Sequence, residues 1–224
     1  MLLQNKNETP SYFRGDNKPI DCECVLELIG KPFNECRIAY VPTAGNPITG
    51  DKSYIKMNMD SIRRLKPQTF ELIDISKIPK SVWFSSFQKS DVLAFGGGSA
   101  EYLLNSLEKS GVKDAFSDLL KTRVYFGSSE GGMVMAKTVS LSKIGLLYWE
   151  KTGKFKDREG LGFVDFEIRP HYNRSNFPEV RDENLEKIAK ENPAPLYAID
   201  DATAVKVVDG KVTVISEGKW KKFN

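Results

Sequence analysis

Short apolar runs rich in β-branched and aromatic residues recur along the chain and predict β-strands. Several of these runs are apolar at nearly every position, which is typical of strands buried on both faces. The runs that we expect to form strands are Arg37–Val41, Phe70–Ile75, Asp91–Phe95, Arg123–Phe126, Phe163–Ile168 and Leu196–Ile199.

Segments with helical periodicity lie between these strands. Lys52–Leu65 places its apolar residues on one stripe, and Ser99–Lys109 does the same with leucines. Two further helices are predicted over Glu130–Lys137 and Asp182–Lys190. The alternation of strands and helices predicts an α/β fold, a mostly parallel sheet with helices on both faces.

Near the end of the chain, the dipeptide Asp209-Gly210 separates two alternating segments. These segments, Thr203–Val208 and Lys211–Ser216, are joined by residues that suit a two-residue turn. We therefore expect an antiparallel β-hairpin added to the α/β core. No repeat or Pro/Gly-rich linker divides the 224 residues, so the whole of 1–224 is predicted to be a single domain.

The composition is that of an ordinary globular protein and argues against several classes of protein. Basic side chains number 33 and acidic ones 30, and they are interspersed, which argues against a nucleic-acid-binding protein. No apolar run approaches the roughly 18–20 residues of a membrane span. The first residues lack the apolar core of a signal peptide. We expect a cytoplasmic protein that binds neither nucleic acid nor membranes.

The cysteines and the histidine limit the chemistry that is open to this chain. Cys22, Cys24 and Cys36 lack the spacing of metal ligands, so we expect free thiols and no metal site. The chain contains one histidine, His171. A mechanism that needs an imidazole base must therefore use that residue.

The segment Phe126-Gly127-Ser128-Ser129-Glu130-Gly131 places Gly-x-Ser-x-Gly between a predicted strand and a predicted helix. This is the context of a nucleophile elbow, in which a sharp turn pushes a serine side chain out of the sheet. Backbone N–H groups behind Ser129 can then hold a developing oxyanion. An ordinary Gly-Ser loop is the alternative, but the flanking strand and helix favour the elbow.

A second run of small residues, Gly96-Gly97-Gly98-Ser99, also joins a predicted strand to a predicted helix. Glycines let the backbone approach a ligand closely and turn its N–H groups toward an anion. The lysine and the spacing of nucleotide-phosphate loops are missing. We therefore favour an oxyanion-hole loop beside Ser129, with a purely structural turn as the alternative.

His171 follows the predicted strand that ends at Ile168, and ligands of open α/β sheets bind at the carboxyl ends of strands. A single histidine is often a surface or core residue without a catalytic role. A serine nucleophile, however, needs a base within hydrogen-bond reach. We therefore predict that His171 activates Ser129.

With these residues together, the chain resembles the dipeptidase E family of serine peptidases, to which cyanophycinase is related. The family cleaves dipeptides with an N-terminal aspartate. The resemblance implies a fold like the class I glutamine amidotransferase domain, with a serine in place of the cysteine. It also implies that Ser129 is the nucleophile, that His171 is the base, and that Gly98 and the N–H of Glu130 form the oxyanion hole. No cofactor is expected.

The resemblance also implies a carboxylate clamp. The family holds the substrate aspartate with an arginine in a Glu-x-Arg context, which Glu179-Val180-Arg181 matches. Arg181 is the candidate clamp, because a guanidinium offers paired donors to a carboxylate. Arg169 and Arg174 flank His171 and are further candidates, and Gly97 is expected to contact the substrate.

The chain departs from the family at three places. Ser99 stands where the family carries asparagine, and Glu130 stands where a small residue usually follows the nucleophile. The Glu130 carboxylate is expected either to repel an anion or to pair with a substrate amine. The acidic third member of the triad is absent at its usual distance after the serine. Counted back from His171, Glu150 is the candidate and Asp157 the second choice.

Taken together, these observations predict a serine-type dipeptidase that hydrolyses dipeptides with an acidic N-terminal residue through an acyl-enzyme. A small peptide is the expected partner, and we expect a monomer or a homodimer. Two alternatives stay open. One is a related peptidase that acts on other acidic or β-aspartyl bonds. The other is a non-catalytic protein of the same fold that binds acidic peptides.

Overall fold

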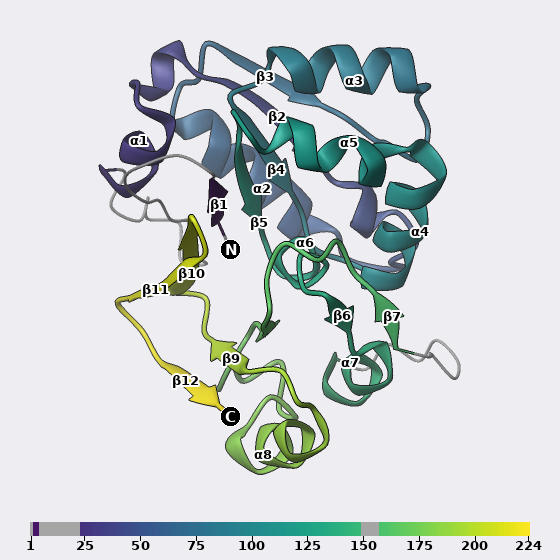
Figure 1. Cartoon of the computed structure of the whole chain (residues 1–224), viewed down its shortest axis with the longest axis vertical. Helices are drawn as coiled ribbons and strands as arrows, with labels where there is room; N and C mark the ends of the chain where they lie inside the picture. Colours follow the sequence, from purple (N-terminus) through teal and green to yellow (C-terminus); the bar gives the residue numbers. More distant parts are fainter. Residues whose placement is uncertain (1, 5–22, 149–156) are drawn as a thin grey trace.

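The computed structural model describes residues 2–4, 23–148 and 157–224, and its main feature is a seven-stranded sheet in the order β11-β10-β1-β5-β4-β2-β3 (Figure 1). Four neighbouring strands are mutually parallel: β3 (Thr69–Leu72), β2 (Arg37–Val41), β4 (Val92–Phe95) and β5 (Val124–Gly127). The mostly parallel sheet expected from the sequence is confirmed.

The remaining strands of the main sheet come from the two ends of the chain. The short β1 (Leu2–Gln4) pairs antiparallel with β5 and parallel with β10 (Thr203–Val208). Strand β10 then turns back into β11 (Lys211–Ser216), with Val208 opposite Lys211. The predicted C-terminal hairpin is confirmed with the expected bounds.

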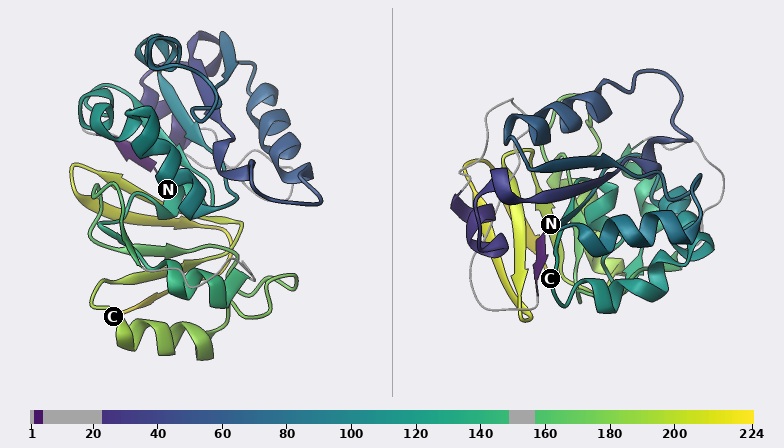
Figure 2. Two further views of the ribbon diagram at one scale, coloured as in Figure 1. Left: turned by 90° about the vertical axis from the view of Figure 1, so that its right-hand side faces the viewer. Right: turned by 90° about the horizontal axis from the view of Figure 1, so that it is seen from above.

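Side chains of the parallel strands alternate between two cores, one on each face of the sheet. In β4, Leu93 and Phe95 belong to one cluster of buried side chains, and Val92 and Ala94 belong to another. The first core is covered by α3 (Lys80–Lys89), α4 (Ala100–Ser110) and α5 (Val112–Leu119), and the second by α1 (Glu23–Ile29) and α2 (Ser53–Arg64). Helices lie on both sides of the sheet (Figure 2).

A second, three-stranded sheet is built by the C-terminal part of the chain. It consists of β8 (Glu167–Arg169), β9 (Leu196–Ile199) and β12 (Trp220–Phe223), and α8 (Asp182–Glu191) packs on it. Figure 2 (left) shows these green and yellow elements below the main sheet. Ile168 and Ile199 belong to the same cluster of buried side chains as Phe95, so the two sheets share one core.

The segment after the predicted nucleophile differs from expectation. Helix α6 covers only Glu130–Met133, and the predicted strand over 163–168 is reduced to β8. The reason is a pairing between the two regions: the amides of Leu161 and Phe163 donate to the carbonyls of Val134 and Met135. These bonds take the place of further helical and strand bonds.

The elements that complete the described chain are short. They are the 3-10 turns η1 (Phe33–Glu35) and η2 (Thr43–Gly45), the strands β6 (Thr138–Val139) and β7 (Arg158–Glu159), and the helix α7 (Leu141–Tyr148). Within the described ranges, no helix has both the length and the apolar character needed to cross a membrane.

Candidate active site

The two glycine-containing loops meet at one edge of the main sheet. Strands β4 and β5 are parallel neighbours, and Phe95 lies opposite Gly127 in their register. The loops that follow them therefore leave the sheet side by side. A Cβ atom added to Gly97 would lie 2.9 Å from the Cβ atom of Ser129, so only glycine fits there. The glycine run and the serine are in direct contact, as the sequence predicted.

Ser129 lies in a strained turn between β5 and α6. Its φ of 50° and ψ of −118° belong to a region that residues with a side chain rarely adopt. The turn brings strand and helix backbones together, because a Cβ atom on Gly127 would lie 2.5 Å from the carbonyl oxygen of Gly131. This is the geometry of a nucleophile elbow, in which both glycines are needed for the close approach.

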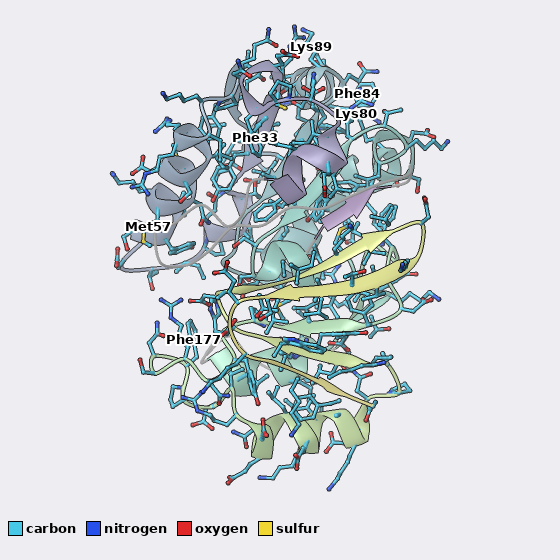
Figure 3. All side chains as sticks on the ribbon, turned by 90° about the vertical axis from the view of Figure 1, so that its left-hand side faces the viewer. Phe33, Met57, Lys80, Phe84, Lys89 and Phe177 are labelled. Carbon is cyan, nitrogen blue, oxygen red and sulfur yellow. The ribbon has the colours of Figure 1, made fainter. Side chains whose placement is uncertain are left out.

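His171 reaches the serine from the second sheet. It follows β8, has a φ of 65°, and places Nε2 3.4 Å from Oγ of Ser129. One face of the imidazole stacks on Phe177, with ring centroids 4.3 Å apart and planes 10° apart. Phe177 is labelled in Figure 3, on the side of the molecule where Met57 of α2 also lies. The expected meeting of Ser129 and His171 is therefore present.

Asp201 orients the imidazole from its other edge. Its Oδ1 lies 2.8 Å from Nδ1 of His171, and its Oδ2 accepts a hydrogen bond from Arg174. Burial opposes ionisation of the carboxyl, but the hydrogen bond and charge of His171 and the charge of Arg174 lower the pKa of Asp201 below its usual value. An ionised carboxylate only accepts hydrogen bonds, so Nδ1 carries a proton, and in the neutral imidazole Nε2 is then the acceptor facing Ser129.

Asp201 lies where the third member of a triad would be, beside Nδ1 of His171, and it is neither of the two acidic residues predicted from the sequence. Glu150 lies outside the described residues, and Asp157 accepts hydrogen bonds from the amide and hydroxyl of Ser142. Both acidic candidates from the sequence lie between the serine and the histidine. The signal that could have identified Asp201 lies after the histidine in the sequence. Strand β9 is parallel to β8, so an acidic residue just after β9 lies at the same edge as a residue just after β8. The amide of Tyr172 donates to the carbonyl of Ile199 and fixes this register.

The predicted oxyanion-hole residues are adjacent, but a carboxylate already occupies the site. Gly98 has a φ of 146°, which suits glycine, and its N–H donates to Oε2 of Glu130 at 2.6 Å. Glu130 is the first residue of α6 and is only 6% exposed. Ser99, which replaces the asparagine of the family, caps α4 by accepting from the amide of Tyr102.

The three candidate arginines have different environments. Arg181 donates to the carbonyls of Phe177, Val180 and Arg174, so its guanidinium braces the loop that carries the ring stacked on His171. Arg169 is 1% exposed and paired with Glu167 at 2.5 Å, which places it in the interior. Arg174 is 43% exposed and contacts Asp201. The geometry favours Arg174 over the predicted Arg181 as a group that meets a substrate.

The described residues offer no metal-binding set. Within the ranges 2–4, 23–148 and 157–224, no group of three or more His, Cys, Asp or Glu side chains is arranged to hold a metal ion. Cys36 is a buried free thiol. Cys22 lies outside the described residues. At the sheet edge, the Ser129 hydroxyl, the His171 imidazole and the Asp201 carboxylate follow one another in a chain of contacts.

Comparison with known proteins places this geometry in a family. The sequence profile of peptidase family S51 matches residues 14–215, most of the chain. The chain belongs to this peptidase family. An uncharacterized peptidase of Pasteurella multocida is 26% identical over 188 residues, covering 81% of this chain and 86% of that protein. A Haemophilus influenzae protein named peptidase E is 25% identical over 195 residues, covering 80% of this chain and 75% of that protein.

Solved structures agree with the fold. A Listeria monocytogenes protein provisionally described as a peptidase E superposes with a TM-score of 0.70 and 21% identity, covering 83% of this chain and 88% of that one. A peptidase from an acI-B1 actinobacterium gives a TM-score of 0.60 and 20% identity over 83% of this chain and 77% of its own. The α/β fold expected from the sequence is that of these peptidases.

Proposed function

We propose that this chain is a serine-type dipeptidase that hydrolyses dipeptides with an acidic N-terminal residue through an acyl-enzyme. The observation that carries the proposal is the chain of contacts from Ser129 through His171 to Asp201. Membership of a peptidase family supports the hydrolysis of a peptide bond. The histidine is the single imidazole of the sequence, so no other histidine serves as the base.

The proposed reaction begins with proton transfer from Ser129 to His171. Nε2 takes the hydroxyl proton as Oγ attacks the scissile carbonyl carbon, and Asp201 stabilises the imidazolium that forms. The imidazolium then gives its proton to the leaving amine, and water hydrolyses the acyl-enzyme by the same route. The separation of 3.4 Å between Oγ and Nε2 is loose, as is common in a site without substrate, where such contacts tighten on binding.

The oxyanion that forms on the attacked carbonyl needs donors beside Oγ. The N–H groups of Gly98 and Glu130 are the proposed donors, since Gly97 and Ser129 are in contact and Gly98 follows directly. One such donor contributes about 2.7–4 kcal/mol to the transition state. The Glu130 side chain must leave Gly98 before this donor is available.

Preference for an acidic N-terminal residue is the part of the proposal that rests on charge. Arg174 uses one terminal nitrogen on Asp201, and its half-exposed guanidinium has further N–H groups for a second carboxylate. It flanks His171, so an acidic side chain held there lies beside the scissile carbonyl. We assign the carboxylate clamp to Arg174 and a loop-bracing role to Arg181.

The test is a panel of dipeptides of the types Asp-X, β-aspartyl-X and Leu-X. The proposal predicts the highest kcat/KM on Asp-X, no turnover by Ser129→Ala, and loss of the acidic preference in Arg174→Ala. Preference for β-aspartyl-X would instead favour the related peptidase. Undiminished binding of Asp-X by both wild type and Ser129→Ala, with no hydrolysis by either, would identify a peptide-binding protein.

A further inference from the structure

We propose that the Glu130 side chain closes the oxyanion hole of the free enzyme and opens it for a substrate that brings a positively charged amine next to the scissile bond. Glu130 is then a specificity-determining residue, and the substrates it admits are peptides with a free α-amino group on the residue whose carbonyl is attacked. The inference rests on the proposed function, because it needs Ser129 to be the nucleophile.

The first support is the position of the carboxylate. Oε2 of Glu130 accepts from the N–H of Gly98 at 2.6 Å, and a Cβ atom on Gly97 would lie 2.8 Å from the same oxygen. One N–H cannot serve this carboxylate and a substrate oxyanion together. Two negative charges side by side in a buried site also repel each other strongly. Acyl transfer therefore requires the carboxylate to move.

The second support is the lack of a counter-charge. Glu130 is 6% exposed, yet among the residues that the structure describes no lysine, arginine or histidine lies within ion-pair distance of it. A buried charge is costly unless it is paired. An ammonium group of the substrate supplies the missing positive charge and three N–H donors to a carboxylate that Gly98 binds only through a neutral N–H.

Covalent structure places that ammonium beside the carboxylate. In a peptide cleaved after its first residue, the α-amino nitrogen is bonded to the carbon next to the scissile carbonyl. When the carbonyl oxygen points at Gly98, the ammonium lies close beside the hole. Glu130 can then exchange the N–H of Gly98 for the ammonium with a side-chain rotation alone, which vacates the donor for the oxyanion.

Tyr54 of α2 offers a second partner for the displaced carboxylate. Its hydroxyl is buried and has no hydrogen-bond partner among the residues that the structure describes. Burial, and after it the negative charge of Glu130, raise the pKa of Tyr54 to about 12, so the hydroxyl keeps its proton at neutral pH. The neighbour that senses the charge of Glu130 is thus a neutral donor whose hydrogen-bonding capacity is unused.

The experiment compares Glu130→Gln and Glu130→Ala with wild type on aspartyl p-nitroanilide and its N-acetyl form. Glu159→Gln is the control, because it removes the same charge from an exposed glutamate of β7 that contacts Lys113. We expect wild type and the control to prefer the free amine strongly. In both Glu130 variants the ratio of kcat/KM for free over acetylated substrate should fall by about tenfold or more, the effect of losing a charge-assisted bond.

Labelling of Ser129 by a fluorophosphonate distinguishes the effect of the Glu130 charge from the effect of a side chain that occupies the N–H of Gly98. The reagent carries no amine, and its phosphonyl oxygen needs the N–H of Gly98. Glu130→Ala should therefore label several times faster than wild type, whereas the glutamine of Glu130→Gln still fills the position and gives a smaller gain. Thermal unfolding of each variant checks that the fold is intact.

The outcomes distinguish this inference from the function on which it rests. Active variants with an unchanged amine ratio and unchanged labelling rates overturn the role of Glu130 and leave the serine peptidase standing. Folded protein that neither labels at Ser129 nor cleaves any peptide, in wild type and all variants, overturns both.

Discussion

Replacing Asp201 by asparagine tests the catalytic arrangement through a change of a few atoms. Arg174 donates to Oδ2 of Asp201, and Nδ1 of His171 donates to Oδ1. An arginine has only donors, so the asparagine must turn its oxygen toward Arg174 and its NH₂ group toward the imidazole. Nδ1 then has to accept, the ring proton moves to Nε2, and Nε2 can no longer take the proton of Ser129.

The size of the effect follows from this loss of the correct tautomer. In serine hydrolases, the same aspartate-to-asparagine change lowers kcat by about 10⁴. That factor corresponds to about 5.4 kcal/mol in the activation barrier. The assay is steady-state hydrolysis of an aspartyl p-nitroanilide, with thermal unfolding to show that the variant is folded.

A second variant makes the reasoning specific to this structure. In Asp201→Asn/Arg174→Ala, nothing holds the amide oxygen away from His171, so the asparagine can turn and accept from Nδ1. We expect a fluorophosphonate to label Ser129 faster in the double variant than in Asp201→Asn alone. This reagent carries no carboxylate, so its reaction does not need the clamp assigned to Arg174. The tautomer account is refuted if Asp201→Asn keeps more than about a tenth of the wild-type kcat, or if removing Arg174 from that variant lowers its rate of fluorophosphonate labelling further.

Three further predictions test other parts of the site. Gly98→Ala should destabilise the fold by about 1–3 kcal/mol and abolish turnover, because a φ of 146° is strained for alanine and the added Cβ atom would meet the carbonyl of Ala44. The matched control in the same unfolding and activity assays is Gly162→Ala, a position with positive φ in open space. Phe177→Ala removes the ring stacked on His171 and should lower kcat by about tenfold, the effect of a loosened base, with a smaller change in KM. The pKa of Asp201 is lowered in the folded protein, so its charge stabilises the fold above the ordinary aspartate pKa of about 3.9, and this stabilisation is lost as the pH falls through the lower folded value. Asp201→Asn should therefore flatten the decline of the unfolding temperature in acid. An unchanged decline would contradict this.

The fold was predictable where one feature dominates the local sequence. Strands β2 and β9 and the hairpin of β10 and β11 have the predicted bounds, because continuous apolar runs and an Asp-Gly turn specify them. Helix α3 was not predicted. Its apolar residues Val82, Trp83 and Phe87 do not form one stripe, and Val82 is 50% exposed while the other two are buried. Tertiary packing, and not local periodicity, defines that element.

The site was predictable for the residues that follow strands and not for the residues that depend on how the sheets pack. Ser129 and Gly97 follow neighbouring strands, so their contact follows from a parallel sheet. Asp201 was missed because its place depends on the pairing of β8 with β9 in a separate sheet. Arg181 matched a short pattern, but its hydrogen bonds to the loop around Phe177 arise from the path of that loop.

The central claim, that His171 activates Ser129 as a nucleophile, is tested most directly by covalent labelling. Wild-type protein is treated with a fluorophosphonate, and the modified peptide is identified by mass spectrometry in parallel with His171→Ala and Ser129→Ala. The account predicts one label on Ser129 in wild type, strongly reduced labelling in His171→Ala and none in Ser129→Ala. A folded wild-type protein that stays unlabelled, or that labels equally well without His171, would contradict it.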